Sequence, residues 1–442
     1  MSNKNKAATK REGAKPALVP KLRFPEFQNA GDWTTEVLRA VATIRTEKVG
    51  NNVCVPMSIT SGVGLVSQED KFGRVIAGDS YKNYLLLKPN EFAYNKSATK
   101  EYPEGFLTLY SGTELAAVPN SIFTCFRING DSPDVRFLNC QFSDNLHGRW
   151  LRKFIQVGAR AHGSLSINDN DLMALPVPVP TGTTSVAEQQ KIAECLSSVD
   201  ELIAAQAAKV DAFKTHKKGL MQQLFPSEGK TFPSLRLPEF QGEEGWKILP
   251  LAALADKIMV GIASAATHAY RETGVPMLRN QNIKEGGIDD SSLLFIDPIY
   301  EAAHKNKRLK TGDVITVRTG YPGLSAVVTK SYENAQCFTS LITRPKADIL
   351  DSNYLCLYIN SPIGKKFMLG AEAGGAQKNV NAGTLETLKV HFPQLEEQRK
   401  IASSLNNLDA LISAETQKLE ALAIHKKGLT QQLFPSAEGI DA

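Results

Sequence analysis

Basic side chains at the ends of apolar runs have the clearest chemical potential in this sequence, namely the binding of phosphates or base edges. In the second half of the chain, Lys305, Lys307 and Arg308 precede an apolar run that ends at Arg318. In the first half, Lys96 follows a similar run and aligns with Arg318. Arginine and lysine at a strand end can reach a DNA phosphate or a guanine edge. The alternative interpretation is a solvated charge at a strand end, because these side chains are mostly exposed for solubility alone.

Two glycine-containing segments, 158–164 and 370–379, suit the same chemistry. Small residues let backbone amides approach a nucleic-acid backbone closely, and polar residues beside them can read base edges. A surface turn that only joins a helix to a strand is the alternative interpretation. The polar residues that we single out are Arg160, Ser164, Gln377, Lys378 and Asn379, together with Arg149 and Arg152 on the predicted helix before the first segment.

Motifs for nucleotide, metal or methyl-transfer chemistry are missing from the sequence. The glycine-rich stretch 62–67 departs from the dinucleotide fingerprint at its last position, and no phosphate-binding Gly-Lys-Ser/Thr loop occurs. There is no Asn/Asp-Pro-Pro-Tyr/Phe segment of the kind that holds a flipped base, and no carboxylate cluster with a lysine suits a nuclease. The six cysteines form no Cys-x-x-Cys pair. We therefore expect a non-catalytic chain with neither a metal site nor a cofactor of its own.

Positive charge is concentrated at the start of the chain. The 442 residues carry a formal net charge of +5, but the first 23 hold seven basic side chains and one acidic one, which leaves −1 for the rest. A DNA-binding face must then arise from local segregation of charge. Residues 1–20 are predicted to be a disordered basic tail without the apolar core of a signal peptide, and no stretch approaches 18 consecutive apolar residues. We expect a cytoplasmic protein that does not span a membrane.

A long internal repeat sets the organisation of the chain. Residues 22–27 match residues 235–240, and residues 188–227 match residues 397–436 with 23 identities over 40 positions. Agreement of this extent indicates a duplicated architecture. Between the matched blocks the two halves diverge. The predicted order is a variable domain at 21–182, a helix at 183–227, a second variable domain at 232–394 and a closing helix at 395–436.

The fold class of the variable domains is predicted to be α+β. Short β-branched runs at 177–180, 314–317 and 326–328 are bounded by glycine, proline and asparagine, which is typical of strands separated by turns. Short helices are expected at 145–157 and 352–369.

Both repeated segments have the signature of a coiled-coil helix, because apolar residues recur with alternating spacings of four and three. One seam position is polar in both copies, as Gln206 and Glu415. A polar seam residue can fix the register of two helices, and a locally solvated gap is the other interpretation. The apolar seam positions are Ile192, Leu196, Val199, Ile203, Val210 and Phe213 in the first helix and Ile401, Leu405, Leu408, Ile412, Leu419 and Leu422 in the second.

Each predicted helix has about 40 residues and is therefore roughly 60 Å long. An isolated apolar stripe would face water, so we expect the two helices to pack on each other. A duplicated chain relates them by a pseudo-twofold axis, which makes the helices antiparallel and places one domain at each end.

Three motifs resemble the specificity subunit of type I restriction-modification systems over residues 20–436. They are the paired Leu-Arg-Phe/Leu-Pro-Glu-Phe openings, the Glu-Gln-x-Lys-Ile-Ala start of each long helix, and the Lys-Lys-Gly-Leu-x-Gln-Gln-Leu-Phe-Pro endings. A proline shortly before the helix start belongs to the pattern, and Pro393 supplies it in the second copy. The first copy departs from the pattern, because seven residues separate Pro180 from Glu188.

The resemblance implies two tandem α/β target-recognition domains separated by two long antiparallel coiled-coil helices. Each domain would read one half of a split site in double-stranded DNA, and the helices would fix the unread spacer. A helix of roughly 60 Å spans about 17 base pairs, enough to hold two readers one to two helical turns apart. Because the variable domains diverge, we expect the two half-sites to differ.

The resemblance also implies partner proteins. The helices would dock two modification (methyltransferase) subunits, and restriction/translocase subunits would then join the complex. S-adenosylmethionine, ATP and Mg²⁺ are expected on those partners and not on this chain.

Two other function classes compete with this expectation. In the first, a scaffold that does not bind DNA would dock partners on the coiled coil and bind protein through the variable domains. Salt-sensitive duplex binding would argue against such a scaffold. In the second, the chain would itself be a nuclease or methyltransferase, which the missing motifs disfavour and which activity of the purified chain alone would support.

Overall fold

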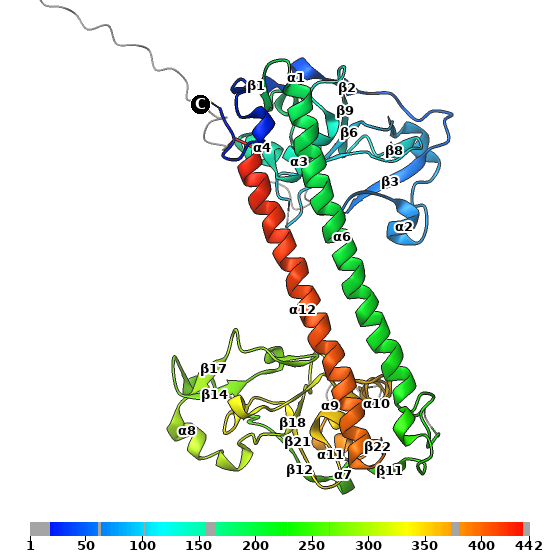
Figure 1. Cartoon of the computed structure of the whole chain (residues 1–442), viewed down its shortest axis with the longest axis vertical. Helices are drawn as coiled ribbons and strands as arrows, with labels where there is room; N and C mark the ends of the chain where they lie inside the picture. The colour runs from blue at the N-terminus through cyan, green and yellow to red at the C-terminus, as the bar shows by residue number, and fades with distance from the viewer. Residues whose placement is uncertain are drawn as a thin grey trace, which may run out of the picture. The chain divides into compact units, whose positions relative to one another are not determined.

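The chain folds as two compact units, each of which contains one α+β domain and one end of each of two long helices (Figure 1). The first unit comprises Met1–Ala205 and Leu419–Ala442, and the second comprises Gln206–Lys418. The computed structural model describes residues 18–60, 63–100, 102–155, 165–227, 229–264, 266–372 and 380–435.

The domain of the first unit is built on two four-stranded sheets. One is antiparallel and has the order β2-β9-β6-β7, and the other has the order β4-β3-β8-β5 with β3 and β8 parallel. A separate pair joins β1 to β10. The bounds are β1 Trp33–Val37, β2 Ala42–Arg45, β3 Val55–Thr60, β4 Gly64–Ser67, β5 Leu85–Leu87, β6 Phe92–Asn95, β7 Phe106–Leu109, β8 Ala116–Val118, β9 Phe123–Ile128 and β10 Pro176–Pro180.

The domain of the second unit repeats this plan. Its antiparallel sheet has the order β12-β21-β18-β19, its second sheet has the order β13-β17-β14-β20 with β14 and β20 parallel, and β11 pairs with β22. A short hairpin of β15 and β16 is added. The bounds are β11 Lys247–Pro250, β12 Ala255–Val260, β13 Tyr270–Arg271, β14 Val275–Leu278, β15 Ile283–Lys284, β16 Gly287–Ile288, β17 Leu294–Ile296, β18 Val314–Thr316, β19 Ser325–Val327, β20 Gln336–Cys337, β21 Leu341–Pro345 and β22 Lys389–Phe392.

Strands β6 and β18 begin in the same way in the two domains. A buried carboxylate directly before each strand, Glu91 or Asp313, accepts the backbone amide of the residue three positions earlier. Asp313 also receives both a 2.8 Å and a 2.7 Å hydrogen bond from Arg344, and such a paired buried charge holds a strand end in place. This anchor positions the residues that leave the other end of each strand.

Short helices cover the sheets, and the third helix of each domain begins at an aspartate cap. Asp134 accepts hydrogen bonds from the first turn of α3, and Asp351 does the same for α9. The helix expected at 352–369 is two helices, because Pro362 cannot continue α9 and instead opens α10. The bounds are α1 Leu38–Val41, α2 Gln68–Phe72, α3 Val135–Ser143, α4 Leu146–Leu151, α5 Asp169–Met173, α7 Leu251–Leu254, α8 Pro298–Ala302, α9 Ser352–Asn360, α10 Pro362–Glu372 and α11 Ala382–Glu386.

The helix expected at 145–157 is shorter in the structure. α4 ends at Leu151 and is followed by a single 3₁₀ turn, Arg152–Phe154. Residues 156 and 157 lie outside the described residues.

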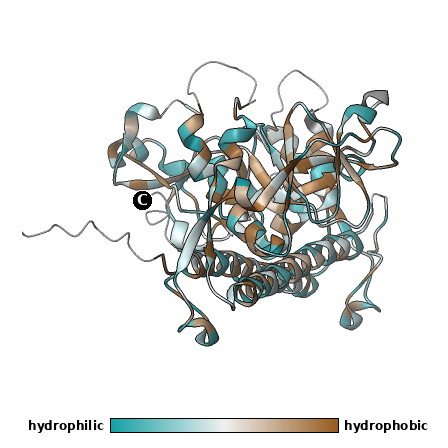
Figure 2. Ribbon diagram, turned by 90° about the horizontal axis from the view of Figure 1, so that it is seen from above, coloured by the Kyte–Doolittle hydropathy of each residue, from teal (hydrophilic) through white to brown (hydrophobic). Residues whose placement is uncertain are grey.

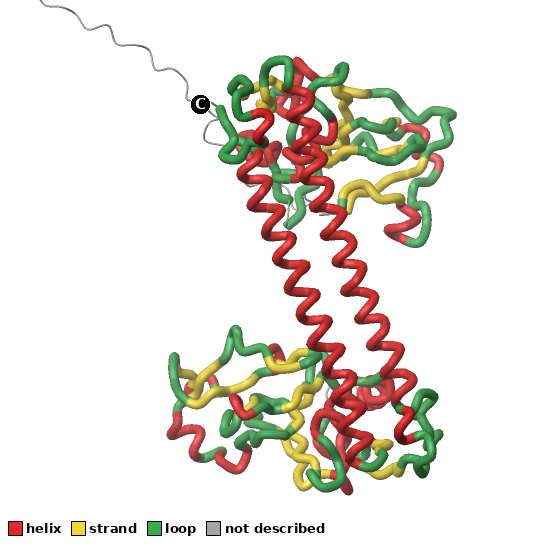
Figure 3. The backbone as a smooth tube through the Cα atoms, in the orientation of Figure 1, coloured by secondary structure: helices red, strands yellow, loops and turns green. Residues whose placement is uncertain are grey.

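The two long helices are continuous over their whole length, as Figure 3 shows. They are α6, Ser185–Leu224, and α12, Leu395–Leu433. In Figure 2 both helices carry hydrophobic and hydrophilic residues along their length, as expected for amphipathic helices. Within the second unit Gln206 contacts Glu415, whereas Lys217, further along α6, contacts Asp409, earlier in α12. The two helices are therefore antiparallel there.

Each domain core is closed by the end of the long helix that began in the other unit. In the first unit Trp33 packs against Phe137 and Phe434, with ring centroids 5.7 and 6.3 Å away. In the second unit Trp246 takes the place of Trp33 and packs against Tyr354 at 6.1 Å, and Tyr354 in turn packs against Phe225 at 5.6 Å. These repeated aromatic clusters explain why the Leu-Phe-Pro endings recur in the sequence.

Candidate nucleic-acid interface

In the second unit, the predicted basic residue Arg318 lies beside the residues that precede α11, Ala382–Glu386. One residue separates Arg318 from the end of the buried strand β18, and Arg318 is half-buried. Its carbonyl oxygen accepts a 3.3 Å hydrogen bond from the backbone amide of Val380, the first described residue after the glycine-containing segment 370–379. Asn381 then caps α11 by accepting from the amide of Thr384. Val380 and the start of α11 are thereby held beside Arg318.

The first unit contains the same arrangement, in which a basic residue after a central strand is bonded to a residue shortly before a capped short helix. We call this arrangement the junction. Lys96 follows β6, and its carbonyl oxygen accepts a 2.7 Å hydrogen bond from the backbone amide of Leu165, the first described residue after segment 158–164. Asn168 caps α5 as Asn381 caps α11. The Lys96 ammonium lies 3.4 Å from Asp169, which also accepts from Thr124. In both units the basic residue is thus bonded to a residue that stands shortly before a short helix, 69 positions further along the chain in the first unit and 62 in the second.

Other predicted basic residues are held by ion pairs within the fold. Arg308 makes two hydrogen bonds of 2.8 and 2.7 Å to the buried carboxylate of Glu301, and these bonds hold the pKa of Glu301 below its usual value. Lys307 donates to the carbonyl of Gly261, while Lys305 is exposed. The DNA contacts of these three residues remain predictions.

In the first unit, Arg152 and Arg149 also contact acidic residues. Arg152 contacts the buried carboxylate of Glu104. Arg149 lies 3.0 Å from Asp144, whose pKa is raised because it is partly buried. Their DNA contacts also remain predictions.

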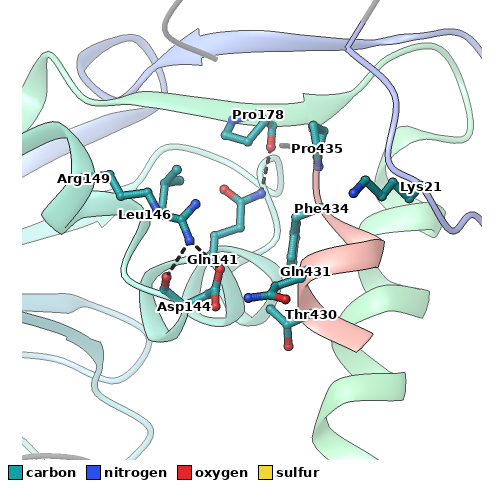
Figure 4. Close-up of a pocket in the computed structure, with 10 residues that line it drawn as sticks. All are labelled: Lys21, Gln141, Asp144, Leu146, Arg149, Pro178, Thr430, Gln431, Phe434 and Pro435. Carbon is teal, nitrogen blue, oxygen red and sulfur yellow. Dashed lines mark hydrogen bonds and ion pairs between the residues drawn. The ribbon is translucent and has the colours of Figure 1, made fainter. Parts of the chain in front are cut away.

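The Arg149 ion pair lines a pocket of about 260 Å³ between α3, α4 and the end of α12. Figure 4 shows Arg149 above Asp144, with the amide of Gln141 turned towards Pro178, whose carbonyl it donates to at 2.8 Å. Arg160, Ser164, Gln377, Lys378 and Asn379 lie outside the described residues.

The sequence interpretation missed a polar clamp in the second unit. Asn280, in the turn after β14, donates to both the carbonyl and the hydroxyl of Thr319 at 3.2 and 3.1 Å. Its own carbonyl oxygen accepts a 2.9 Å hydrogen bond from Ser340. The next residue, Gln281, is exposed and donates to Ser292. The signal was available, because the polar run 279–282 follows a strand as Arg318 does.

The predicted apolar seam positions are all at least half-buried in the structure, and their packing between the two helices remains a prediction. Ile192, Leu196, Val210, Ile401 and Leu405 are buried, and the other predicted apolar seam residues are half-buried. The polar pair is in contact, since Gln206 donates to Glu415 at 2.7 Å and Lys209 lies 2.6 Å from the same carboxylate. The hydrogen bond from Lys209 is the largest cause of a lowered pKa for Glu415. The polar seam position is a bonded pair and not a solvated gap.

In each unit the opening motif of a repeat is bonded to the start of a long helix. These two motifs are among those most alike in the two repeats. Arg23 of the first opening makes two 2.7 Å hydrogen bonds to Glu188 at the start of α6, and Arg236 makes two of 2.8 Å to Glu397 at the start of α12. All four side chains are at least nine-tenths buried. These motifs therefore join domain to helix.

A groove lies between each domain and the helix pair, lined by equivalent residues in the two repeats. The groove of the first unit has a volume of about 420 Å³ and includes Lys426 and Lys427; that of the second has about 630 Å³ and includes Lys217 and Lys218. Lys426 pairs with Asp200 as Lys217 pairs with Asp409, each at 2.6 Å. We call these two features the junction grooves. Their shared lining gives the chain two similar surfaces.

Metal and membrane features are not seen in the described parts of the chain. No three His, Cys, Asp or Glu side chains there are grouped to hold a metal ion. None of the helices in those parts combines the length and the apolar character that a membrane span needs.

The family model for the type I restriction modification DNA specificity domain matches residues 243–423, which include the second domain and most of α12. That part of the chain is similar to the DNA specificity domain of type I restriction-modification systems, and the curated relatives below are specificity subunits of such systems. The resemblance inferred from the repeated motifs is confirmed.

Several curated specificity subunits are similar in sequence. The type I restriction enzyme MjaVIII specificity subunit of Methanocaldococcus jannaschii is 26% identical over 56% of this chain and 59% of its own length. The putative MjaX specificity subunit of the same organism is 28% identical over 65% of each chain. The EcoKI specificity subunit of Escherichia coli is 21% identical over 44% of this chain and 42% of its own. Less than two thirds of each of these relatives is covered.

Solved structures of type I systems share the fold. The specificity subunit from M. genitalium aligns with a TM-score of 0.56 at 15% identity, over 95% of this chain and all of that one. A chain from a structure on the assembly and conformational transition of the type I system aligns with the same TM-score at 16% identity, over 91% of this chain and 98% of its own. The predicted α+β fold with two domains and two long helices is confirmed.

Proposed function

We propose that this chain is the DNA-specificity subunit of a type I restriction-modification complex and has no catalytic activity of its own. Each domain reads one half of a bipartite, asymmetric site in double-stranded DNA, and the long helices set the spacer. The observation that carries this proposal is the junction built twice, in which a basic residue leaving a central strand accepts, at its backbone carbonyl, a hydrogen bond from the residue that follows a glycine-containing segment of the sequence. A basic side chain beside closely approachable backbone suits a phosphate backbone and its base edges.

Differences between the two junctions support an asymmetric site. Lysine stands at position 96 where arginine stands at position 318, and Lys96 is paired with Asp169. Arginine can form a two-pronged contact with guanine, whereas lysine is a point charge. The Asn280 clamp on Thr319 is a further feature of the second domain. Two readers built on one plan but with different side chains select different half-sites.

Partners complete the proposed activity. Two modification (methyltransferase) subunits dock on the helices, restriction/translocase subunits join them, and S-adenosylmethionine, ATP and Mg²⁺ belong to those partners. We assign these groups to the partners because this sequence lacks the motifs that would hold them. The complex works in the cytoplasm, where it meets DNA.

The helix surfaces support docking of two copies of one partner. The junction grooves have equivalent linings in the two repeats. Leu202 and Leu411, at equivalent positions of α6 and α12, lie outside the seam and are 58% and 40% exposed. Exposed apolar side chains beside a polar groove are typical of protein interaction surfaces. A repeated surface binds a repeated partner in the same way twice.

The test is to express the chain with its modification subunit and map N6-methyladenine in the host DNA. We expect one bipartite motif with a gap of fixed length. Arg318→Ala and Lys96→Ala should each weaken one half-site and spare the other, while Lys247→Ala, an exposed control on β11, leaves both unchanged. Equal loss at both half-sites would refute the assignment of these two residues.

The coiled-coil scaffold that does not bind DNA predicts a different result. In that case the complex would assemble with an active modification subunit, but no bipartite motif would be methylated. Duplex binding by the assembled complex would also be weak and insensitive to salt, whereas contacts with phosphates make binding fall steeply as salt rises.

A further inference from the structure

Tyr321 is a large aromatic residue left exposed beside the candidate interface. It lies in the loop between β18 and β19, three residues after Arg318, and 83% of its surface is exposed. Aromatic rings carry a large apolar area, and in a free protein most of that area is usually packed. A ring held in water at the tip of a loop beside Arg318 therefore needs a reason.

The loop that carries Tyr321 is braced from both sides. The backbone amides of Val317 and Gly323 donate to Leu324 and Val317 at 2.8 and 3.0 Å, which closes the loop at its base. Asn280 holds Thr319 by two hydrogen bonds.

Two glycines shape the same loop. Gly320 and Gly323 have φ of +86° and +93°, a region that other residues rarely adopt. A side-chain carbon on Gly323 would also come within 2.8 Å of Met368, so this position admits only glycine. The ring is therefore presented on a rigid support, which lowers the ordering cost of any contact that it makes.

The equivalent loop of the first domain presents no such ring. Its tyrosine, Tyr102, packs edge to face on Phe106 with ring centroids 4.5 Å apart and is half-buried. Of these two equivalent loops, only the one in the second domain therefore has an exposed tyrosine ring. A ring has no favourable contact with a phosphate, but in a duplex it can pack on the methyl edge of a thymine in the major groove.

We propose that Tyr321 contacts a base of the second half-site through its ring and determines which base is accepted at that position. The inference rests on the proposed function, and it adds to Arg318 a reader that acts by shape and not by charge. Asn280 is a positioning residue, because it acts on the ring only through Thr319 and the loop.

The test measures binding of the assembled complex to duplexes in which each position of the second half-site is changed in turn. Tyr321→Ala should weaken binding to the native site about 10-fold and abolish base preference at one position, since one base contact is worth roughly 1–3 kcal/mol. Tyr321→Phe keeps the ring and should stay within about twofold of the native chain. Ile299→Ala, which removes another highly exposed apolar side chain of the same unit, is the matched control and should change nothing.

A double-mutant cycle tests the role of Asn280. In the Asn280→Ala background the ring is no longer held, so the effect of Tyr321→Ala on base preference should shrink. Strictly additive effects of the two changes would overturn the positioning role.

Three results would overturn the inference. Unchanged base preference at every position in Tyr321→Ala would show that the ring reads nothing. An equal loss in Tyr321→Phe would assign the contact to the hydroxyl group and hence to a phosphate or water. Absence of sequence preference in the native complex would refute the proposed function itself. This outcome differs from a failure of the Tyr321 inference alone, because it is seen before any substitution is made.

Discussion

Removal of the Arg236 guanidinium should destabilise the second unit strongly. Arg236 and Glu397 form two hydrogen bonds of 2.8 Å, and their side chains are 8% and 0% exposed. In Arg236→Met the stem of the side chain is kept, but the Glu397 carboxylate is left buried without its partner. Loss of one member of a buried pair typically costs about 3–5 kcal/mol. That is a large part of the 5–15 kcal/mol by which a domain is usually stable.

Two further variants separate the buried charge from other causes. Replacing both residues, Arg236→Met with Glu397→Met, removes the stranded charge and should restore most of the stability. Lys400→Met breaks the ion pair of Lys400 with Glu239, which is 3.9 Å long and about half exposed, and should cost less than about 1 kcal/mol.

Urea unfolding followed by the fluorescence of Trp246 measures this effect. Trp246 is buried in the second unit, whereas the other two tryptophans, Trp33 and Trp150, are in the first. In a Trp33→Phe and Trp150→Phe background the signal therefore reports the second unit alone. If Arg236→Met costs no more than Lys400→Met, or if the double replacement recovers nothing, the argument from the buried pair is wrong.

Three other predictions concern the spacer, acid stability and partner docking. Seven residues inserted after Gln206 and after Glu415 keep the seam spacing and lengthen both helices by about 10 Å, so methylation mapping should find a gap about 3 base pairs longer. His147 is buried, which lowers its pKa to about 4. Below its unfolded pKa of about 6.5 the unfolded chain binds a proton that the folded one does not, so the first unit should lose about 2 kcal/mol between pH 6.5 and pH 5. Urea titrations at both pH values measure this loss, and His147→Phe should remove it. Lys218→Glu or Lys427→Glu should each remove one modification subunit from the complex, as native mass spectrometry would show, and two retained subunits would contradict docking at the junction grooves.

The long helices could be predicted because their signal is local. The alternating spacing of apolar residues from Ile192 to Phe213 repeats every seven residues, about two helical turns, and Pro226 marks the end of α6. The fold class followed from the same kind of local pattern. In contrast, the sequence does not say whether Pro362 kinks the expected 352–369 helix or divides it into two helices. The outcome depends on the residues that pack around Pro362 in the folded domain.

The candidate site was only partly predictable, because its decisive contacts join distant parts of the chain. The alignment of Lys96 with Arg318 placed the junction correctly at the end of a central strand in both domains. The polar run 279–282 marks Asn280 as a candidate, but its bond to Thr319, 39 residues away, has no local pattern. Exposure of a residue such as Tyr321 can be judged only once the loop around it is built.

Each domain core is closed by the end of a long helix that begins in the other unit, and this affects when each domain can finish folding during synthesis. Trp33 and Phe137 are synthesised early, but Phe434, which covers them, follows Phe137 by 297 residues. Until then the first domain has an open hydrophobic face, whereas the second receives Phe225 before its own strands are complete. A product terminated shortly before Phe434 would therefore carry an unfinished first domain, exposed to proteases and chaperones, beside a second domain that has all of its own strands.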